Sequence, residues 1–111
     1  MDDDVKKQIA DDFHEAVNMT ASEIEAWLDT DESKSVGQKD DDGGESVGHG
    51  SGRRIVTILR TKKADLTDAD YAHMKKVHGY VARHSAQRPD GDVTDTDWRY
   101  SLMNWGNDPQ K

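Results

Sequence analysis

The sequence predicts an all-α fold, a compact single domain of five helices. Apolar residues recur at spacings of three and four in five separate segments, which is the period of a helix packed on a core. Ser or Thr stands near the start of most of these segments, where its side-chain oxygen can cap a helix. No segment shows the alternation of apolar and polar residues that indicates a strand. A chain of 111 residues has the usual length of one domain.

The first helix is predicted over residues 5–17, where the apolar residues share one face: Val5, Ile9, Phe13, Ala16 and Val17. Thr20 and Glu23 then form the T-x-x-E pattern of a capping box, which predicts the start of a second helix. The connection between the two helices is short, so we expect them to form a hairpin. Acidic residues dominate this hairpin, which we place at residues 1–29.

Helical periodicity disappears between Thr30 and Gly52, where Gly, Ser, Asp and Glu prevail. We therefore predict a long loop over residues 30–52. Loops longer than about 15 residues are uncommon in compact domains, so this one is expected to be either disordered or functional. Residues 53–111 form the third part of the predicted domain, a basic-to-neutral helical part.

A third helix is predicted to begin at Ser51, its cap, and to run to about Lys63. Thr67 and Asp70 repeat the capping pattern at the start of a fourth helix. The apolar stripe of the fourth helix consists of Tyr71, Met74, Val77 and Val81. The order and spacing of these signals place two helices after the loop.

Gly79 interrupts the fourth helix and costs it about 1 kcal/mol relative to alanine. The Pro-Asp-Gly turn at 89–91 closes that helix. The last helix is predicted over residues 96–105, and Gly106 is placed to form its left-handed C-terminal cap. One face of this helix carries Trp98, Leu102 and Trp105. We expect the two tryptophans to lie in the core, with stacking on nucleic-acid bases as the alternative.

Composition excludes several classes of small protein. The absence of cysteine excludes a disulfide framework and thiolate metal sites. No apolar run is long enough for a membrane span, and the acidic start of the chain is unlike a secretory signal, so we expect a cytoplasmic protein with no membrane association. The five histidines lack zinc-site spacing, and no motif positions a nucleophile or a general base. We therefore expect no metal, no cofactor and no enzymatic activity.

The formal net charge is −8, and 18 of the 23 acidic residues are aspartate. An aspartate-rich surface with few large apolar residues is typical of proteins that work in concentrated salt, where screening weakens self-repulsion. One hypothesis is therefore a salt-loving source. The alternative is an ordinary acidic soluble protein.

Charge is divided unevenly along the chain. Residues 1–50 hold 4 basic and 15 acidic residues, giving −11, whereas residues 51–111 hold 11 and 8, giving +3. Residues 51–88 alone hold nine basic and three acidic residues, giving +6. Such asymmetry indicates a contact with nucleic acid or with a membrane surface, or two halves that attract each other.

The string GHGSGRR is the most specific local feature of the sequence. A glycine-rich turn leading into a helix exposes backbone N–H groups at the positive end of the helix dipole, which is a site for phosphate or sulfate. The string lacks the ending of a Walker loop and follows no strand. The alternative is a plain flexible loop with a helix cap. The cradle would consist of Gly48, Gly50, Ser51, Gly52, Arg53 and Arg54.

Further basic residues of the same half would support binding of a nucleic-acid backbone: Arg60, Lys63, Lys75, Lys76 and Arg83. The leading hypothesis is a non-enzymatic, nucleic-acid-associated helical module. The alternative for these residues is a solvated basic face that pairs with the acidic N-terminal half. A second hypothesis is therefore a protein-interaction or stress-related helical adaptor, which binds a protein partner or a second copy of itself and no nucleic acid.

Three strings carry a resemblance to a known family: TDESKSVG at 30–37, ESVGHGSGRRIV at 45–56 and WRYSLMNWG at 98–106. In this order they resemble a family of short microbial and fungal proteins catalogued as domain of unknown function 3140. The resemblance extends from about Phe13 to Pro109. It implies no particular activity, although some members carry an automatically assigned DNA-binding name.

Overall fold

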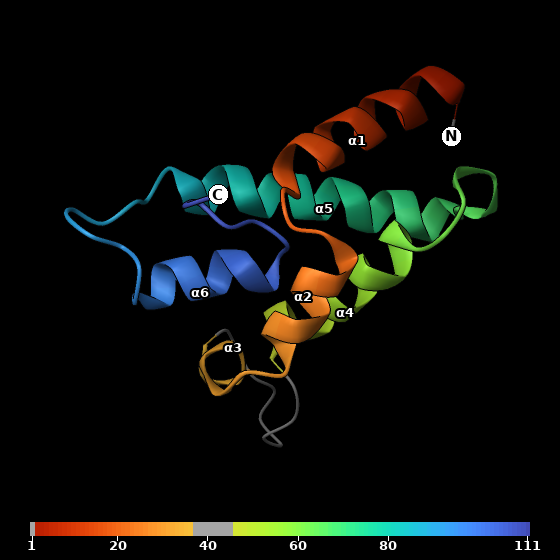
Figure 1. Ribbon diagram of the computed structural model, residues 1–111. Helices are drawn as coiled ribbons and strands as arrows, with labels where there is room; N and C mark the ends of the chain where they lie inside the picture. The colour runs from red at the N-terminus through yellow and green to blue at the C-terminus, as the bar shows by residue number, and fades with distance from the viewer. Residues whose placement is uncertain (1, 37–45) are drawn as a thin grey trace.

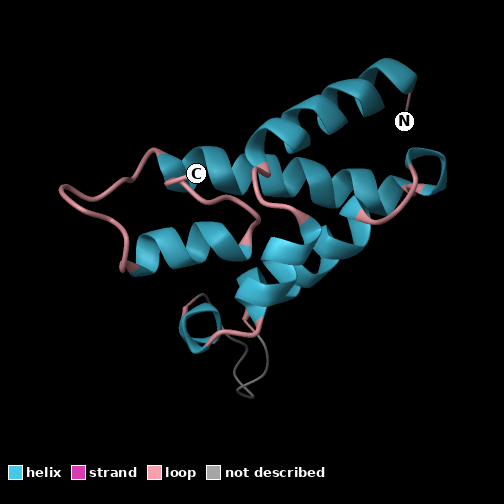
Figure 2. Ribbon diagram, in the orientation of Figure 1, coloured by secondary structure: helices cyan, strands magenta, loops and turns pink. Residues whose placement is uncertain are grey.

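A computed structural model describes residues 2–36 and 46–111, and within these residues the chain is all-helical (Figures 1 and 2). The helices are α1 (Asp3–Ala16), α2 (Ala21–Leu28), α3 (Asp31–Ser35), α4 (Val47–Leu59), α5 (Asp68–Ser85) and α6 (Asp97–Asn104), with a short 3-10 helix at Lys63–Asp65. The described residues contain no strand, which confirms the all-α prediction. None of their helices combines the length and the apolarity that a membrane span requires.

Local capping signals predicted the starts of α2 and α5 correctly. The Thr20 hydroxyl accepts a hydrogen bond from the Glu23 amide at 3.1 Å, and the Glu23 carboxylate accepts one from the Thr20 amide at 2.9 Å. Thr67 and Asp70 form the same reciprocal pair at 3.2 and 3.0 Å. Each capping box satisfies two backbone groups of its own segment, so the sequence alone specifies it.

Gly106 ends α6 in the left-handed region, with φ of 81°. The Gly106 amide donates to Met103 and the Asn107 amide donates to Leu102, both at 3.0 Å, as in a Schellman cap. The Gly106 carbonyl in turn accepts hydrogen bonds from the amides of Asn18 and Met19. The end of α6 is thereby tied to the connection between α1 and α2.

The predicted hairpin of the first two helices is wrong. Helix α1 packs along α5, and α2 packs along α4, so each finds its main partner in the other half of the chain (Figure 1). The connection between α1 and α2 is held by the C-terminal segment, which keeps the two helices apart. Apolar periodicity identifies the face that a helix buries but not the helix that covers it.

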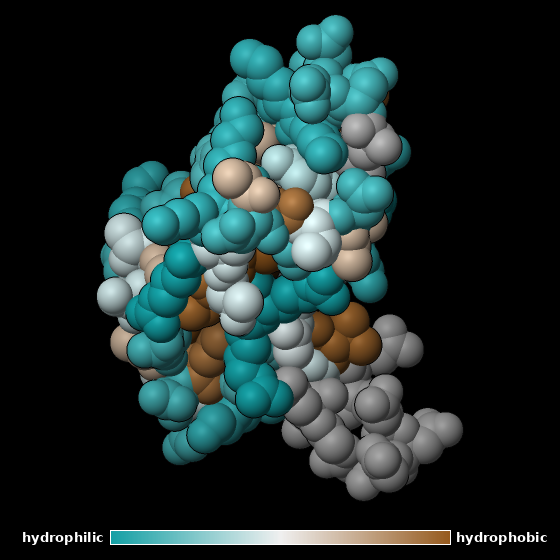
Figure 3. All heavy atoms as spheres, turned by 90° about the vertical axis from the view of Figure 1, so that its right-hand side faces the viewer, coloured by the Kyte–Doolittle hydropathy of each residue, from teal (hydrophilic) through white to brown (hydrophobic). Residues whose placement is uncertain are grey.

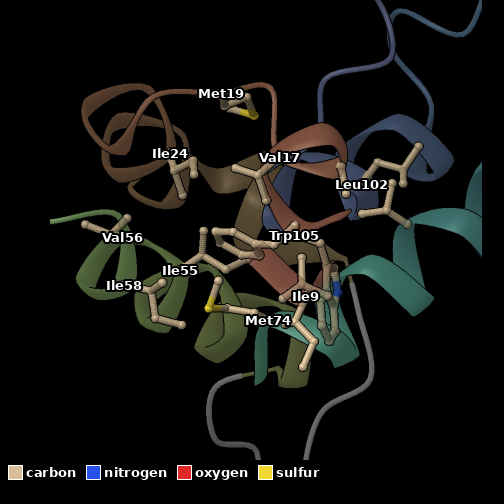
Figure 4. Close-up of a cluster of buried hydrophobic side chains, with 14 of the residues drawn as sticks. Ile9, Val17, Met19, Ile24, Ile55, Val56, Ile58, Met74, Leu102 and Trp105 are labelled. Atoms are coloured by element: carbon tan, nitrogen blue, oxygen red, sulfur yellow. The ribbon is translucent and has the colours of Figure 1, made fainter. Parts of the chain in front are cut away.

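Helix α6 lies at the centre of the packing and contacts α2, α3, α4 and α5. Leu102 of α6 and Trp105, which follows the helix as its C-cap, join Ile55 of α4, Met74 of α5 and Ile9 of α1 in one core (Figure 4). The surface is mostly hydrophilic on the side that Figure 3 shows, with apolar side chains visible between the polar ones. The predicted core position of Trp105 is confirmed, and Trp98 packs against the same cluster.

The predicted loop over residues 30–52 is wrong at both ends. Thr30 caps α3, which adds a sixth α-helix to the five predicted. Helix α4 begins at Val47, with Ser46 rather than Ser51 as its cap. The middle of the predicted loop, 37–45, lies outside the described residues. Helix α5 runs through Gly79 without a break.

Candidate functional site

The glycine-rich string lies inside a helix and is largely buried. The Ser46 hydroxyl accepts from the His49 amide at 3.1 Å, and the Gly50 amide donates to the Ser46 carbonyl at 3.0 Å. Gly48, Ser51 and Gly52 are buried within α4. The predicted turn before the helix is therefore wrong, and these residues do not present an open cradle of amides.

Close packing explains why glycines occupy this part of α4. A Cβ atom at Gly52 would lie 2.6 Å from the Asn104 carbonyl oxygen and 2.8 Å from Leu28 Cδ2. A Cβ atom at Gly48 would lie 3.1 Å from Trp105 Nε1. Glycine lowers helix propensity by about 1 kcal/mol per residue, but here it allows α4 to approach α2 and α6.

Asn104 connects α6 to two other helices through its buried amide. Its Oδ1 accepts hydrogen bonds from Trp27 Nε1 at 2.7 Å and from Ser33 Oγ at 2.5 Å. Its Nδ2 donates to the Ser33 carbonyl at 3.1 Å. Asn104 is 1% exposed, so these three hydrogen bonds take the place of water for its amide group.

The predicted basic residues do not share one face. Arg60 forms an ion pair with Glu25 at 2.7 Å, and Arg54 forms one with Asp70 at 3.4 Å. Arg53, Arg54 and Arg60 line one groove between α2 and α4, Lys63 is exposed on the 3-10 helix, and Lys75 lines a pocket beside α1. Acidic residues therefore pair with two of the predicted cations, and the predicted cations are divided among several pockets.

Lys76 and Arg83 are brought together in a pocket of about 380 Å³ between the start of α4, the middle of α5 and the end of α6. The described residues that line it include no carboxylate: Val47, Gly48, Lys76, Tyr80, Arg83, Ser101, Asn104 and Trp105. Neither cation forms an ion pair within the part of the chain that the structure describes. On a chain with net charge −8, this cationic pocket is suited to an anion.

Aromatic rings from α5 and α6 stack beside the pocket. Tyr80 and Trp105 lie 4.2 Å apart between ring centroids, with an interplanar angle of 13°. His73 continues the stack from Trp105, and His84 continues it from Tyr80 towards Trp98. Burial raises the pKa of the Tyr80 hydroxyl. Interleaved rings fix the two helices, and with them the walls of the pocket.

The indole N–H of Trp105 differs from the two other indole N–H groups of the protein. Trp27 donates to Asn104, and Trp98 donates to the His84 carbonyl at 2.8 Å. Trp105 is 4% exposed, and its N–H donates no hydrogen bond to any described residue. The described residues contain no fully enclosed polar side-chain atom without a partner, so this N–H reaches the open space of the pocket.

His73 and Ser51 join α5 to α4 next to the pocket, with 2.9 Å between Nε2 and Oγ. Burial lowers the pKa of His73, and the charges of Arg54 and Lys76 lower it further. The ring is therefore kept neutral near pH 7. Within residues 2–36 and 46–111, no three His, Asp or Glu side chains come close enough to hold a metal ion.

A family model described as "Protein of unknown function (DUF3140)" matches residues 12–103, which is most of the chain. The chain belongs to this family. The resemblance predicted from three sequence strings is thereby confirmed. Comparisons of this DUF3140 chain with curated proteins and with solved structures gave no match.

The three strings that identify this DUF3140 chain meet around Asn104. Ser33 comes from the first string, Gly48 and Gly52 from the second, and Asn104 and Trp105 from the third. Lys76, Tyr80 and Arg83 of α5 also line the pocket but lie outside the three strings. Nothing in the sequence shows that they adjoin Val47 and Trp105. One usable signal was present, because Lys76, Tyr80 and Arg83 are spaced to share one side of a helix.

Proposed function

We propose that this protein is a non-enzymatic, nucleic-acid-associated module that holds a backbone phosphate in the pocket between Lys76 and Arg83. The observation that carries the proposal is this pair of cations, which no described carboxylate neutralises. Lys and Arg bind phosphate through charge-assisted hydrogen bonds. The buried glycines of α4 take no part in this proposal, and Arg54 and Arg60 take none because each already has a carboxylate partner.

Removing both cations of the pocket is expected to weaken nucleic-acid binding by at least tenfold at low salt. Each charge-assisted bond contributes about 1.5 kcal/mol or more, and about 1.4 kcal/mol corresponds to a factor of ten. The measurement is fluorescence anisotropy of labelled single strands and duplexes, of DNA and of RNA, titrated with the wild type and with Lys76→Ala/Arg83→Ala.

The matched control is Lys62→Ala/Lys63→Ala, which removes the same charge from two exposed residues between α4 and α5. Its effect is expected to be less than tenfold because neither lysine is among the described residues that line the pocket, so the variant loses only their long-range attraction for the nucleic acid. Equal losses in the two double variants would reject the pocket as the binding site. No binding of any of the four nucleic acids by the wild type would reject the function.

A second candidate, a protein-interaction adaptor, is favoured by the groove between α2 and α4. This groove has a volume of about 780 Å³, with Leu28 and Val56 among its apolar residues. Charges of both signs line it, including the exposed ion pair of Arg60 with Glu25. Charges of both signs beside apolar residues are suited to a protein partner or a second copy of this chain.

If the groove joins two copies, light scattering is expected to show a dimer in dilute buffer that dissociates as salt is added, since salt screens exposed ion pairs. Arg60→Glu is expected to shift the mass towards the monomer, and Arg60→Glu with Glu25→Arg to restore the dimer. A mass that stays monomeric at all salt concentrations would exclude self-association through this groove.

A further inference from the structure

We infer that the Lys76–Arg83 pocket holds one unpaired nucleotide of a single strand, with the base against Val47 and Tyr80 and the phosphate between the two cations. This inference rests on the proposed function and specifies its ligand. Three features of the pocket carry it: the number of available cations, an indole N–H that reaches the pocket without a partner among the described residues, and an exposed apolar rim.

The number of cations favours a single phosphate over the backbone of a duplex. A duplex presents one charge about every 1.7 Å along its axis, so a protein that follows it needs a row of cations. Here Arg54 and Arg60 are occupied by carboxylates, and Lys75 faces a pocket that also contains Asp12. Among the described residues that line the concave pocket, Lys76 and Arg83 are the only cations.

The indole N–H of Trp105 indicates that the ligand carries a hydrogen-bond acceptor. Its side chain is more than nine-tenths buried, yet this donor has no partner among the described residues. It faces Gly48, whose missing side chain leaves it uncovered, because a Cβ there would lie 3.1 Å from Nε1. A phosphate oxygen or a base carbonyl accepts such a hydrogen bond.

Val47 supplies the apolar part of the site. It lines the pocket and is 47% exposed, and the only other large apolar side chain of the described residues with comparable exposure is Val5. Inorganic phosphate gains nothing from an apolar rim, whereas a base can cover Val47 and lie beside the half-buried Tyr80. Cations, a neutral donor and an apolar rim together match a nucleoside phosphate.

Gly79 gives Arg83 room to serve this pocket. A Cβ at Gly79 would lie 3.0 Å from Arg83 Nη1, so the guanidinium lies against the glycine backbone, one helical turn back along α5. Glycine within a helix costs about 1 kcal/mol relative to alanine. This cost arises at Gly79, the residue against which the Arg83 guanidinium lies.

The first test uses the three indole N–H signals in nuclear magnetic resonance spectra of the full chain. A nucleoside monophosphate is expected to shift the Trp105 signal and to leave those of Trp27 and Trp98 in place, because both of these are already hydrogen-bonded. Inorganic phosphate at the same concentration is expected to cause a smaller shift. A Trp105 signal that no nucleotide moves would overturn the inference.

The second test compares labelled oligonucleotides of about 12 nucleotides, a length within the range that single-strand binding domains cover. Single strands are expected to bind about threefold or more tighter than abasic strands and than duplexes, since a base that covers Val47 removes apolar surface from water. With one phosphate neutralised, the slope of log affinity against log salt is expected to be about −0.7. A duplex or an abasic strand that binds as tightly as the normal single strand would overturn the inference while leaving the proposed function intact.

The third test is Val47→Ala, with Val5→Ala as a control of nearly the same exposure, 46% against 47%. Val47→Ala is expected to weaken single-strand binding about threefold or more, because it removes two methyl groups from the contact with the base. Val5 lies on α1 and lines a different pocket, so its replacement is expected to leave binding unchanged. Equal affinities for the two variants would contradict the placement of the base.

Discussion

Replacing Asn104 with alanine is expected to lower the free energy of unfolding by at least about 3 kcal/mol. Three polar groups lose their hydrogen-bond partner, and each loss costs about 1 kcal/mol or more. The substitution removes the partner of Trp27 Nε1, of Ser33 Oγ and of the Ser33 carbonyl. Asn104 is 1% exposed, so water does not replace the lost bonds without rearrangement. For a domain of this size, the melting temperature is expected to fall by about 10 °C or more.

Asn18→Ala is the matched control, because it deletes the same amide from an exposed position. Asn18 exchanges two hydrogen bonds with the backbone of Asp108, at 3.0 and 2.8 Å. Water can take over both, so a loss of about 1 kcal/mol or less is expected. Denaturant unfolding of the two variants and the wild type provides the comparison. If Asn104→Ala is no less stable than Asn18→Ala, the buried amide does not hold α2, α3 and α6 together.

Sequence reasoning succeeded where a signal and its structural effect lie within one segment. The capping boxes at Thr20 and Thr67 and the terminating Gly106 are complete within a few residues, and all three are present. It failed at the start of α4, where Ser46 and Ser51 are equally good caps and the glycines favour a loop by propensity. Gly52 packs closely against Leu28 and Asn104, which lie 24 and 52 residues away in the sequence. These long-range contacts favour the helix over a loop at Gly52.

The candidate site was predicted in part for the same reason. Lys76 and Arg83 were among the predicted phosphate-binding residues, since a basic segment is visible in the sequence. The ion pairs of Arg54 with Asp70 and Arg60 with Glu25 join residues 16 and 35 positions apart, and no spacing rule indicates them. The aromatic wall also depends on how α5 and α6 align, which periodicity does not specify.

The same substitution, glycine to alanine, is expected to have opposite effects on stability in α4 and in α5. Gly52→Ala forces a methyl group to within 2.6 Å of the Asn104 carbonyl oxygen and 2.8 Å of Leu28. Neither the backbone oxygen nor the packed leucine can move freely, so overpacking costs about 1–3 kcal/mol. The gain in helix propensity, about 1 kcal/mol, offsets only part of a larger cost. With an overpacking cost of about 3 kcal/mol, the upper end of its range, the protein is expected to lose about 2 kcal/mol of stability.

Gly79→Ala meets only the end of a flexible side chain, since the nearest atom to its methyl group is Arg83 Nη1 at 3.0 Å. The guanidinium can swing aside, so the propensity term dominates and the protein is expected to gain up to about 1 kcal/mol. In thermal unfolding, the melting temperature is expected to be lower than that of the wild type for Gly52→Ala and higher for Gly79→Ala. Gly79→Ala is also expected to weaken binding of single strands, because Arg83 loses its place against α5. A Gly79→Ala protein that is more stable and binds single strands as tightly as the wild type would show that the position of Arg83 does not matter to the ligand. A Gly52→Ala protein as stable as the wild type would show that α4 can move away from α6.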